Sequence, residues 1–410
     1  MPISQDTKKV ASTLQDRIGN AVEVGAFGEL RVAEPIIKIA VTFEYPFDED
    51  NVVDVTTTGT GTAVAQVDGS LCRVRTNGTG TACVLTKDNL RYTAGATAEQ
   101  NSTVAFVGTP TANTEMLAGL FDDEDGFYLG YKGTDFVCGY RNDGSAGTKD
   151  TEVTSGNFNG DFDIATYLST NRTNIHRIRI KFGYLGVGNA SFEIKPDREN
   201  GEWRTVHIFK TDGALSGRTH TGTPILPIKI EVSATGGEDV YIESGSWSAI
   251  TYARPTTAQD RPFHDYGSLS IATGDVVAYR VKTLIGSKMS KVVARLIKAT
   301  FATGTEGLCR FRFIVNPTSI TGGAWSDVER GSIVEVNTTF TSYAGGVTGF
   351  TVHVPVPSQG SGNSGEDDVD FSLFGIKGRP GESFVIVKDR LFGSGGDNTT
   401  AWAISGVEEY

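Results

Sequence analysis

The most conspicuous candidate for chemistry in this sequence is a run of four carboxylates at positions 122 to 125, directly before Gly126. Closely spaced carboxylates on a glycine-bounded turn can bind calcium through their oxygens, and Asp122, Asp123 and Asp125 are the candidate ligands. Their spacing departs from that of the EF-hand loop. The alternative is a solvated hairpin turn between strands at 116–121 and 127–131, and this is the interpretation we favour.

Two of the four cysteines are predicted to meet across a hairpin. Asn77-Gly78 is a strong signal for a two-residue hairpin loop, and such a loop places Cys72 directly opposite Cys83. Residues opposite each other in an antiparallel pair lie within reach of a disulfide. The alternative is that both are small buried apolar side chains, which the lack of an export signal favours.

The sequence carries none of the motifs that mark the common active sites. There is no nucleophile elbow, no phosphate-binding loop and no H-E-x-x-H zinc motif, and the five histidines lack metal-ligand spacing. Two carboxylates that meet only in the folded chain would suffice for glycoside hydrolysis, which keeps a hydrolase as an alternative. We expect no enzymatic activity and no cofactor.

Composition narrows the classes of partner. The 410 residues contain 37 Lys and Arg against 49 Asp and Glu, a net charge of −12, whereas binding to nucleic-acid phosphates needs an excess of cations. No apolar run approaches the roughly 18 residues of a membrane span. The first residues also lack the apolar region of a secretory signal peptide. We therefore expect neither nucleic-acid nor membrane binding.

From residue 35 onward, apolar residues recur at every second position, as in half-buried antiparallel strands. The clearest segments are 178–184, 228–232, 309–315 and 350–356. Along the segment 178–184 and at the residue before it, Arg177, Arg179 and Lys181 alternate with apolar residues, which makes one face of the strand cationic. Gly-, Ser- and Thr-rich clusters, as at 58–62 and 360–365, separate the segments and favour β-sandwiches over βαβ units.

The segment 252–262 is polar, holds two prolines and has no periodicity, which indicates a domain boundary. The sequence therefore predicts an all-β protein with two antiparallel, jelly-roll-like β-sandwich domains at 35–252 and 263–410, each long enough to bury a core.

Residues 1–34 are predicted to form an N-terminal docking arm with a short helix. Val10, Leu14 and Ile18 recur at i, i+4 and i+8, which gives a narrow apolar stripe on an otherwise polar helix. Such a stripe gains little by packing on its own chain, so it suits assembly with a partner or another copy. The alternative is a frayed terminus.

Residues 117–136, which read LAGLFDDEDGFYLGYKGTDF, resemble a segment common in virion structural proteins of tailed bacteriophages. The likeness extends to Arg141-Asn142-Asp143-Gly144 and to flanking segments at 27–35 and 182–194. The motifs consist of turn glycines and strand aromatics, so they identify relatives better than they identify chemistry.

The resemblance implies a non-enzymatic component of the phage particle, such as a capsid decoration, a neck or head fibre or a baseplate protein. It further implies a homo-oligomer, with a trimer favoured, that assembles with other virion proteins after synthesis in the host cytoplasm.

A second hypothesis is a glycan- or receptor-binding module at the particle surface, which would bind a host surface glycan. Sugar rings stack on exposed aromatic side chains, and the candidates are Tyr128, Tyr131, Tyr140 and Trp203. The competing interpretation is that these aromatics belong to the core.

Overall fold

The structure of the protein is a computed structural model. It describes residues 35–49, 52–92, 96–142, 150–183, 188–196, 202–210, 220–223, 225–252, 260–271, 273–286, 288–305, 307–356, 365–370, 377–392 and 396–409. The predicted docking arm, with Val10, Leu14 and Ile18, lies outside the described residues.

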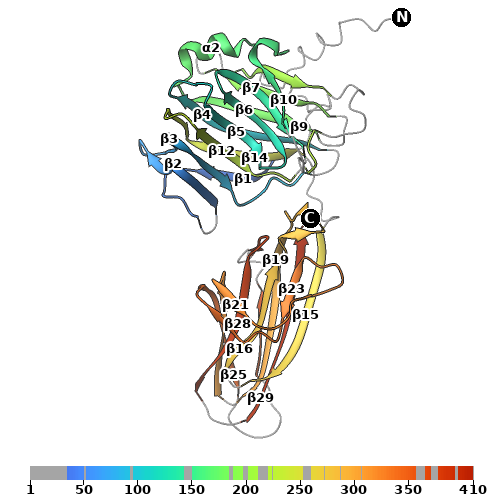
Figure 1. The fold of residues 1–410 in the computed structure, drawn as a ribbon. Coiled ribbons are helices and arrows are strands. Elements are labelled where there is room, and N and C mark those ends of the chain that lie inside the picture. Colours follow the sequence, from blue (N-terminus) through green and yellow to red (C-terminus); the bar gives the residue numbers. More distant parts are fainter. Residues whose placement is uncertain are drawn as a thin grey trace, which may run out of the picture. The chain divides into compact units, whose positions relative to one another are not determined.

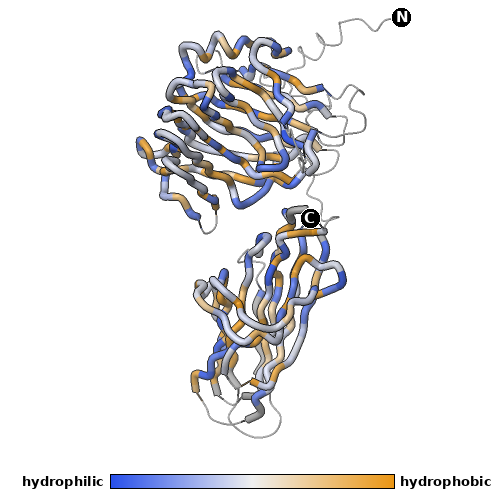
Figure 2. Tube along the Cα trace, viewed as in Figure 1, coloured by the Kyte–Doolittle hydropathy of each residue, from blue (hydrophilic) through white to orange (hydrophobic). Residues whose placement is uncertain are grey.

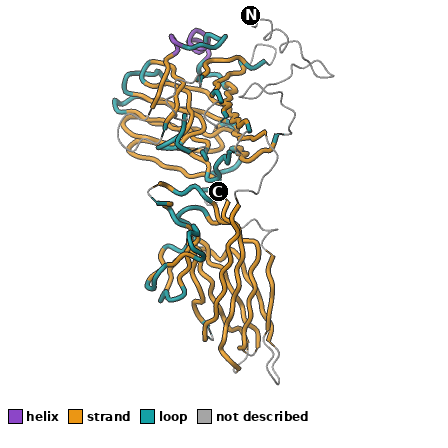
Figure 3. Tube along the Cα trace, turned by 90° about the vertical axis from the view of Figure 1, so that its right-hand side faces the viewer, coloured by secondary structure: helices purple, strands orange, loops and turns teal. Residues whose placement is uncertain are grey.

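The chain divides into two compact units, 1–255 and 256–410, which we call unit 1 and unit 2. The division falls inside the segment where the sequence indicates a boundary. In the part of the chain that the structure describes, both units consist mainly of strands, and helix is found only at one end of unit 1 (Figure 3). The predicted all-β class with antiparallel sheets is confirmed.

The described residues of unit 1 form fourteen strands and two short helices. They are β1 (Ile36–Thr42), β2 (Val53–Val67), β3 (Leu71–Thr86), β4 (Thr97–Val107), β5 (Thr114–Phe121), β6 (Gly126–Lys132), β7 (Asp135–Arg141), β8 (Asp150–Thr154), η1 (Ser155–Asn157), α2 (Ile164–Asn171), β9 (His176–Phe182), β10 (Ala190–Lys195), β11 (Arg204–Phe209), β12 (Ile228–Ala234), β13 (Asp239–Ser244) and β14 (Ser246–Tyr252).

The strands of unit 1 form two antiparallel layers (Figure 1). The layer that we call the back sheet has the order β1-β14-β4-β9-β10-β11. The front sheet has the order β2-β3-β12-β5-β6-β7-β8. Strand β13 pairs with both β3 and β4, and so joins the two layers along one side.

The core of unit 1 lies between these layers, because every second residue of each strand points inward. On β12, Ile228, Ile230 and Val232 are buried in the core, whereas Lys229 and Glu231 lie on the other face. Hydrophobic positions accordingly alternate with hydrophilic ones along the strands (Figure 2). Each fully buried aliphatic or aromatic side chain contributes about 1.5–3 kcal/mol.

The predicted hairpin at Asn77-Gly78 is wrong, because β3 runs through these residues without turning. On one side β3 pairs with β2, and on the other it pairs with β13 up to Asn77 and with β12 from Gly80. Gly78 sits at this change of partner, where its N–H donates to the Glu238 carbonyl. A strand with neighbours on both sides gains more from continuing than from folding back on itself.

The turn of this hairpin lies further back in the sequence, between β2 and β3. Gln66, Asp68 and Gly69 have positive φ angles of 61°, 50° and 88°, as a tight reversal requires. The cluster at 58–62, which the sequence suggests as a turn, lies within β2 and produces only a shift of register after Gly59. Glycine therefore marks a bulge there, and not a chain reversal.

Unit 2 contains β15 (Asp260–Ser270), β16 (Gly274–Val281), β17 (Leu284–Ile285), β18 (Lys288–Met289), β19 (Val293–Thr305), β20 (Gly307–Val315), β21 (Ser319–Thr321), β22 (Ser326–Asp327), β23 (Val334–Asn337), β24 (Ser342–Ala344), β25 (Val347–Val356), β26 (Gly365–Asp370), β27 (Lys377–Gly378), β28 (Ser383–Phe392) and β29 (Gly396–Glu409).

Unit 2 is also built from two main antiparallel sheets. One has the order β15-β29-β19-β26, and the other has the order β22-β23-β16-β28-β20-β25. Residues of both sheets, such as Phe301 of β19 and Phe311 of β20, stack in a common core with ring centroids 4.6 Å apart. The strands predicted at 309–315 and 350–356 correspond to β20 and β25.

Candidate functional site

The acidic run at 122–125 is the turn between β5 and β6, as the favoured interpretation predicted. Asp122 Oδ1 accepts hydrogen bonds from the backbone N–H groups of Glu124 and Asp125 at 2.9 and 2.8 Å. Its own N–H donates to the Asp125 carbonyl at 2.8 Å. The Asp122 carboxylate therefore serves as an acceptor that closes the turn.

The two other calcium candidates contact different parts of unit 1. Asp125 is buried and its Oδ1 accepts a hydrogen bond from Gly222 N at 2.6 Å, whereas the exposed Asp123 pairs with Lys229 Nζ at 2.8 Å. Across the described ranges, no three His, Cys, Asp or Glu side chains are grouped so that they could hold a metal ion. The geometry thus does not support calcium binding by Asp122, Asp123 and Asp125.

The cross-strand prediction for Cys72 and Cys83 is also wrong. Both lie on β3, and eleven residues of extended strand separate them by on the order of 35 Å, far beyond the reach of a disulfide. Cys72 instead lies opposite Ser244, and Cys83 lies between Thr56 and Glu231. Both thiols are free and buried, and burial raises the pKa of each, as expected for unreactive core side chains.

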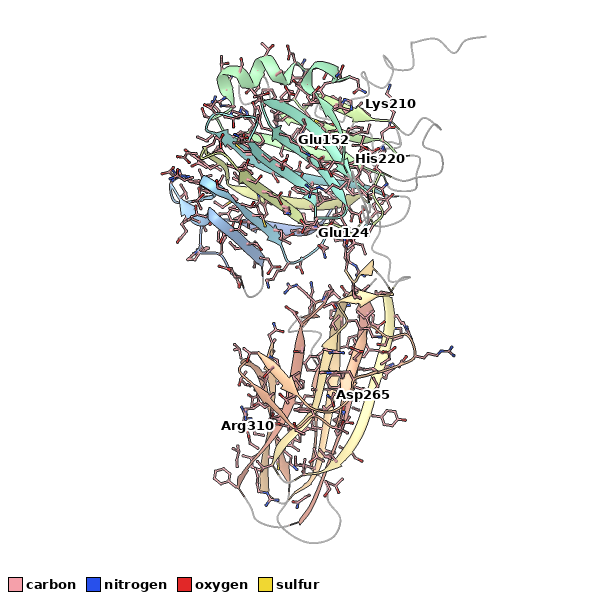
Figure 4. The ribbon with its side chains drawn as sticks, viewed as in Figure 1. Glu124, Glu152, Lys210, His220, Asp265 and Arg310 are labelled. Carbon is pink, nitrogen blue, oxygen red and sulfur yellow. The ribbon has the colours of Figure 1, made fainter. Side chains whose placement is uncertain are left out.

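The outer face of the front sheet carries many charges, but they neutralise one another. Glu152 accepts from the Tyr128 hydroxyl and from Lys132 Nζ, both at 2.6 Å (Glu152 is labelled in Figure 4). Asp150 lies 3.3 Å from Lys132 Nζ and 3.2 Å from Arg141 Nε. Because these groups satisfy each other, the face offers few free donors or acceptors to a ligand.

In three of the four aromatic candidates for sugar stacking, the ring packs against other side chains of the protein. Tyr128 is fully buried beneath this charged network. Tyr131 packs edge-on against Phe106 and Phe136 in the core. Tyr140 packs against Phe209 and His220, each 5.0 Å away between ring centroids. Only Trp203, which lies just before β11, borders an open hollow.

This hollow lies on the outer face of the back sheet and has a volume of about 370 Å³; we call it the back-sheet hollow. It is lined by Ala40, Val41 and Thr42 of β1, Asn101, Ser102 and Thr103 of β4, Arg177 of β9, Ser246, Trp247 and Ser248 of β14, and Trp203. The volume falls in the range of small-ligand sites, roughly 300–1,000 Å³.

The hollow forms because small side chains meet across neighbouring strands. Ala40 lies opposite Ser248, which in turn lies opposite Asn101. In the next row, Thr42 lies opposite Ser246. The larger side chains of Trp203 and Arg177 also line the hollow. The short side chains of β1, β14 and β4 leave the surface lower than these larger neighbours do, which produces the depression.

The lining offers hydrogen-bonding groups that the protein does not use. In the described part of the chain, the hydroxyls of Thr42, Ser246 and Ser248 and the indole N–H of Trp203 make no hydrogen bond. Asn101 donates through Nδ2 to Glu99 at 2.9 Å, which leaves its amide oxygen as an acceptor. The hollow therefore presents both donors and acceptors to a ligand.

The Trp203 ring is held in place from one side. The Arg179 guanidinium lies over it, with the Cζ atom 4.2 Å from the ring centroid, a cation–π contact. Arg179 is in turn fixed by Glu193, whose Oε2 accepts from Arg179 Nε at 2.7 Å. Lys181 Nζ binds the other oxygen of Glu193 at 2.6 Å. A buried ion network thus positions the aromatic ring.

Part of this site was predictable from the sequence. Trp203 was a candidate because it is aromatic, and the cationic side of β9 was predicted from the alternation of cationic and apolar residues. The contributions of Asn101, Ser246 and Ser248 were missed, because single polar residues at outward positions of strands carry no distinguishing signal. Only the pairing of β1, β14 and β4 brings them together.

Two buried histidines should make unit 1 sensitive to acid. His207 and His220 pack against Phe209, and burial lowers the pKa of both below the ordinary 6.5 (His220 is labelled in Figure 4). The unfolded chain then binds protons that the folded chain does not, so the free energy of unfolding should fall as the pH drops through 6.5.

Urea denaturation between about pH 7.5 and pH 5 measures this loss. His220→Phe keeps an aromatic ring beside Tyr140 and Phe209 and should flatten the pH dependence. Equal slopes for His220→Phe and wild type would contradict the prediction.

No family model and no curated protein matches the chain. Among solved structures, a legume lectin-like domain from Entamoeba histolytica is 12% identical, covers 51% of this chain and 95% of its own, and has a TM-score of 0.32. Lectin I-B4 from Griffonia simplicifolia is 12% identical over 52% of this chain and 100% of its own, with a TM-score of 0.31. An endo-β-1,4-glucuronan lyase from Trichoderma reesei is 11% identical, covers 50% of this chain and 90% of its own, and has a TM-score of 0.28.

These TM-scores lie well below 0.5, so the likeness is too weak to support a function for this chain. Over the described ranges, no helix has the length and apolar character needed to cross a membrane.

Proposed function

We propose that this protein binds carbohydrate through the back-sheet hollow. A sugar presents hydroxyl groups around its ring and apolar C–H groups on its faces. A site that recognises it therefore needs neutral donors and acceptors together with an aromatic surface. The observation that carries the proposal is that Trp203 borders a hollow whose Thr42, Ser246 and Ser248 hydroxyls have no partner among the described residues.

Binding fits the lining better than catalysis does. Of the residues that line the hollow, Arg177 is the only ionisable one. Acid–base hydrolysis of a glycoside requires two carboxyl groups. Glu99 has a carboxylate next to the lining, but it accepts hydrogen bonds from the lining residue Asn101 and from the Tyr252 hydroxyl. The hollow therefore supports recognition without a reaction.

The proposal is tested with the full chain on a glycan array, followed by calorimetry on the best ligand. Trp203→Ala should weaken binding about 30-fold, equivalent to about 2 kcal/mol for loss of a central aromatic contact. Trp325 in unit 2 is a matched control, because Arg280 lies over its ring at 4.4 Å and it is absent from the hollow. Unchanged affinity of Trp203→Ala, or an array without binding, would refute the proposal.

We also propose that the chain assembles on the particle of a tailed bacteriophage, as a homo-oligomer with other virion proteins. Support comes from the resemblance of residues 117–136 to virion structural proteins. Mass spectrometry of purified particles should detect the chain, and sedimentation of the isolated protein should give the mass of an oligomer, with a trimer expected. A monomer that never copurifies with particles would contradict this.

A further inference from the structure

The outward face of β9 carries three cations, and their surroundings differ. Arg179 and Lys181 both bind the Glu193 carboxylate, at 2.7 and 2.6 Å. A second carboxylate, that of Glu99, also lies near Arg179, with 3.9 Å between Glu99 Oε2 and Arg179 Nη1. Arg177, two residues before Arg179, is exposed and lines the back-sheet hollow. Within the described ranges its guanidinium has neither an ion pair nor a hydrogen bond.

The neighbours of Arg177 increase its need for an anion. Lys195 of β10 lies directly opposite Arg177, and Thr103 of β4 lies opposite it on the other side. Like charges directly opposite each other in an antiparallel pair are destabilising. Lys195 also has no carboxylate partner in the described part of the chain. One uncompensated cation, Arg177, therefore lines the hollow, and a second, Lys195, is its cross-strand neighbour outside the lining.

A guanidinium presents a planar fork of donors that matches the oxygens of a carboxylate or sulfate group. The Thr42, Ser246 and Ser248 hydroxyls and the Trp203 ring supply the neutral part of the same site. We infer that the ligand of the back-sheet hollow is an anionic glycan, whose acidic group binds Arg177 while Lys195 adds attraction. This inference rests on the proposed function and names its substrate class.

The test uses matched pairs of glycans that differ only in the anionic group. Uronate oligosaccharides are compared with their carboxyl-reduced forms, sialylated glycans with desialylated ones, and sulfated glycans with desulfated ones. The full chain is measured by array and calorimetry beside Arg177→Gln and Lys195→Gln. Lys210→Gln is the charge-matched control, because Lys210 is an exposed cation outside the lining (Figure 4).

We expect wild type to bind the anionic member of at least one pair about 10- to 100-fold more tightly, as for a charged hydrogen bond. Arg177→Gln should reduce the affinity to that of the neutral member, Lys195→Gln should lower it less, and Lys210→Gln should leave it unchanged. The pair that responds distinguishes a carboxylate from a sulfate.

Failure of this inference differs from failure of the proposed function. If both members of every pair bind equally, or Arg177→Gln keeps the preference, the anionic class is wrong while carbohydrate binding stands. If no glycan binds, or Trp203→Ala binds as well as wild type, carbohydrate binding at this hollow is itself wrong, and the inference falls with it.

Discussion

Glu193→Gln is expected to lower the free energy of unfolding of unit 1 by about 3–5 kcal/mol, because it breaks a buried ion network from one side. Glu193 and Arg179 are both buried, with exposed fractions of 6% and 5%. The carboxylate binds Arg179 with one oxygen and Lys181 with the other. Glutamine keeps the shape but removes the negative charge that Arg179 and Lys181 share. The Glu99 carboxylate, whose Oε2 lies 3.9 Å from Arg179 Nη1, is more distant and compensates the loss less well.

Urea denaturation followed by circular dichroism gives the size of this loss. Asp239→Asn is the matched control, because Asp239 binds Arg75 through two hydrogen bonds of 2.7 and 2.6 Å on the exposed surface. Exposed pairs contribute about 0–1 kcal/mol, so the control should be mild. A loss for Glu193→Gln no larger than that for Asp239→Asn would contradict the prediction.

The same substitution has a consequence at the hollow. Arg179 holds the Trp203 ring by a cation–π contact, and Glu193 holds Arg179. Glycan binding by Glu193→Gln should therefore weaken even at temperatures where unit 1 remains folded. If this variant fails to fold, Lys181→Gln, which removes one cation and leaves Arg179 paired, should fold and bind like wild type.

Gly130→Ala should destabilise unit 1 by about 3 kcal/mol, because the new Cβ meets backbone atoms. A Cβ built at Gly130 lies 1.9 Å from the Met116 carbonyl oxygen on β5, and neither strand can move without breaking its pairing. The φ angle of Gly130 is +150°, which side chains rarely adopt. Crowding and backbone strain therefore act together.

Two other glycines separate these causes. Gly237 has a φ of +93° with nothing within 4 Å of a built Cβ, so Gly237→Ala tests strain alone and should cost about 1 kcal/mol. Gly156 has open space and no positive φ, so Gly156→Ala should stay within about 0.5 kcal/mol of wild type. Equal stabilities of Gly130→Ala and Gly156→Ala would contradict the argument.

Gly130 belongs to the segment 117–136 that resembles virion proteins, and close approach to the neighbouring strand also explains two other glycines of that motif. Built Cβ atoms at Gly119 and Gly126 lie 2.2 and 2.3 Å from backbone atoms of the adjacent strand. The motif therefore reflects how closely β5 and β6 approach each other. It concerns folding of the front sheet and contributes no residue to the back-sheet hollow.

Local features were predictable because their cause lies within a few residues. Alternation of apolar and polar residues located β9, β12, β20 and β25, since a strand exposes alternate faces whatever it pairs with. The hairpin at 122–125 was predictable for the same reason: carboxylates followed by glycine favour a turn, and Asp122 closes it.

Which strands pair with one another was not predictable, because the pairing partners lie far apart in the sequence. Asn77-Gly78 favours a turn locally, but β13 and β12, about 150 residues later, pair with β3 on either side of it and keep it extended. Cys72 and Cys83 consequently share a strand, and the disulfide hypothesis depended on a turn that does not form.

The sequence by itself determined the fold class, the cationic side of β9 and the presence of an aromatic residue at 203. Only the tertiary structure decided that Tyr128, Tyr131 and Tyr140 are occupied while Trp203 borders a hollow. It also decided that, among the described residues, Arg177 lacks the carboxylate that Arg179 and Lys181 share. The reason is that a binding surface on a sheet is built across strands, and its neighbours are set by pairing and register over long separations, which local pattern does not encode.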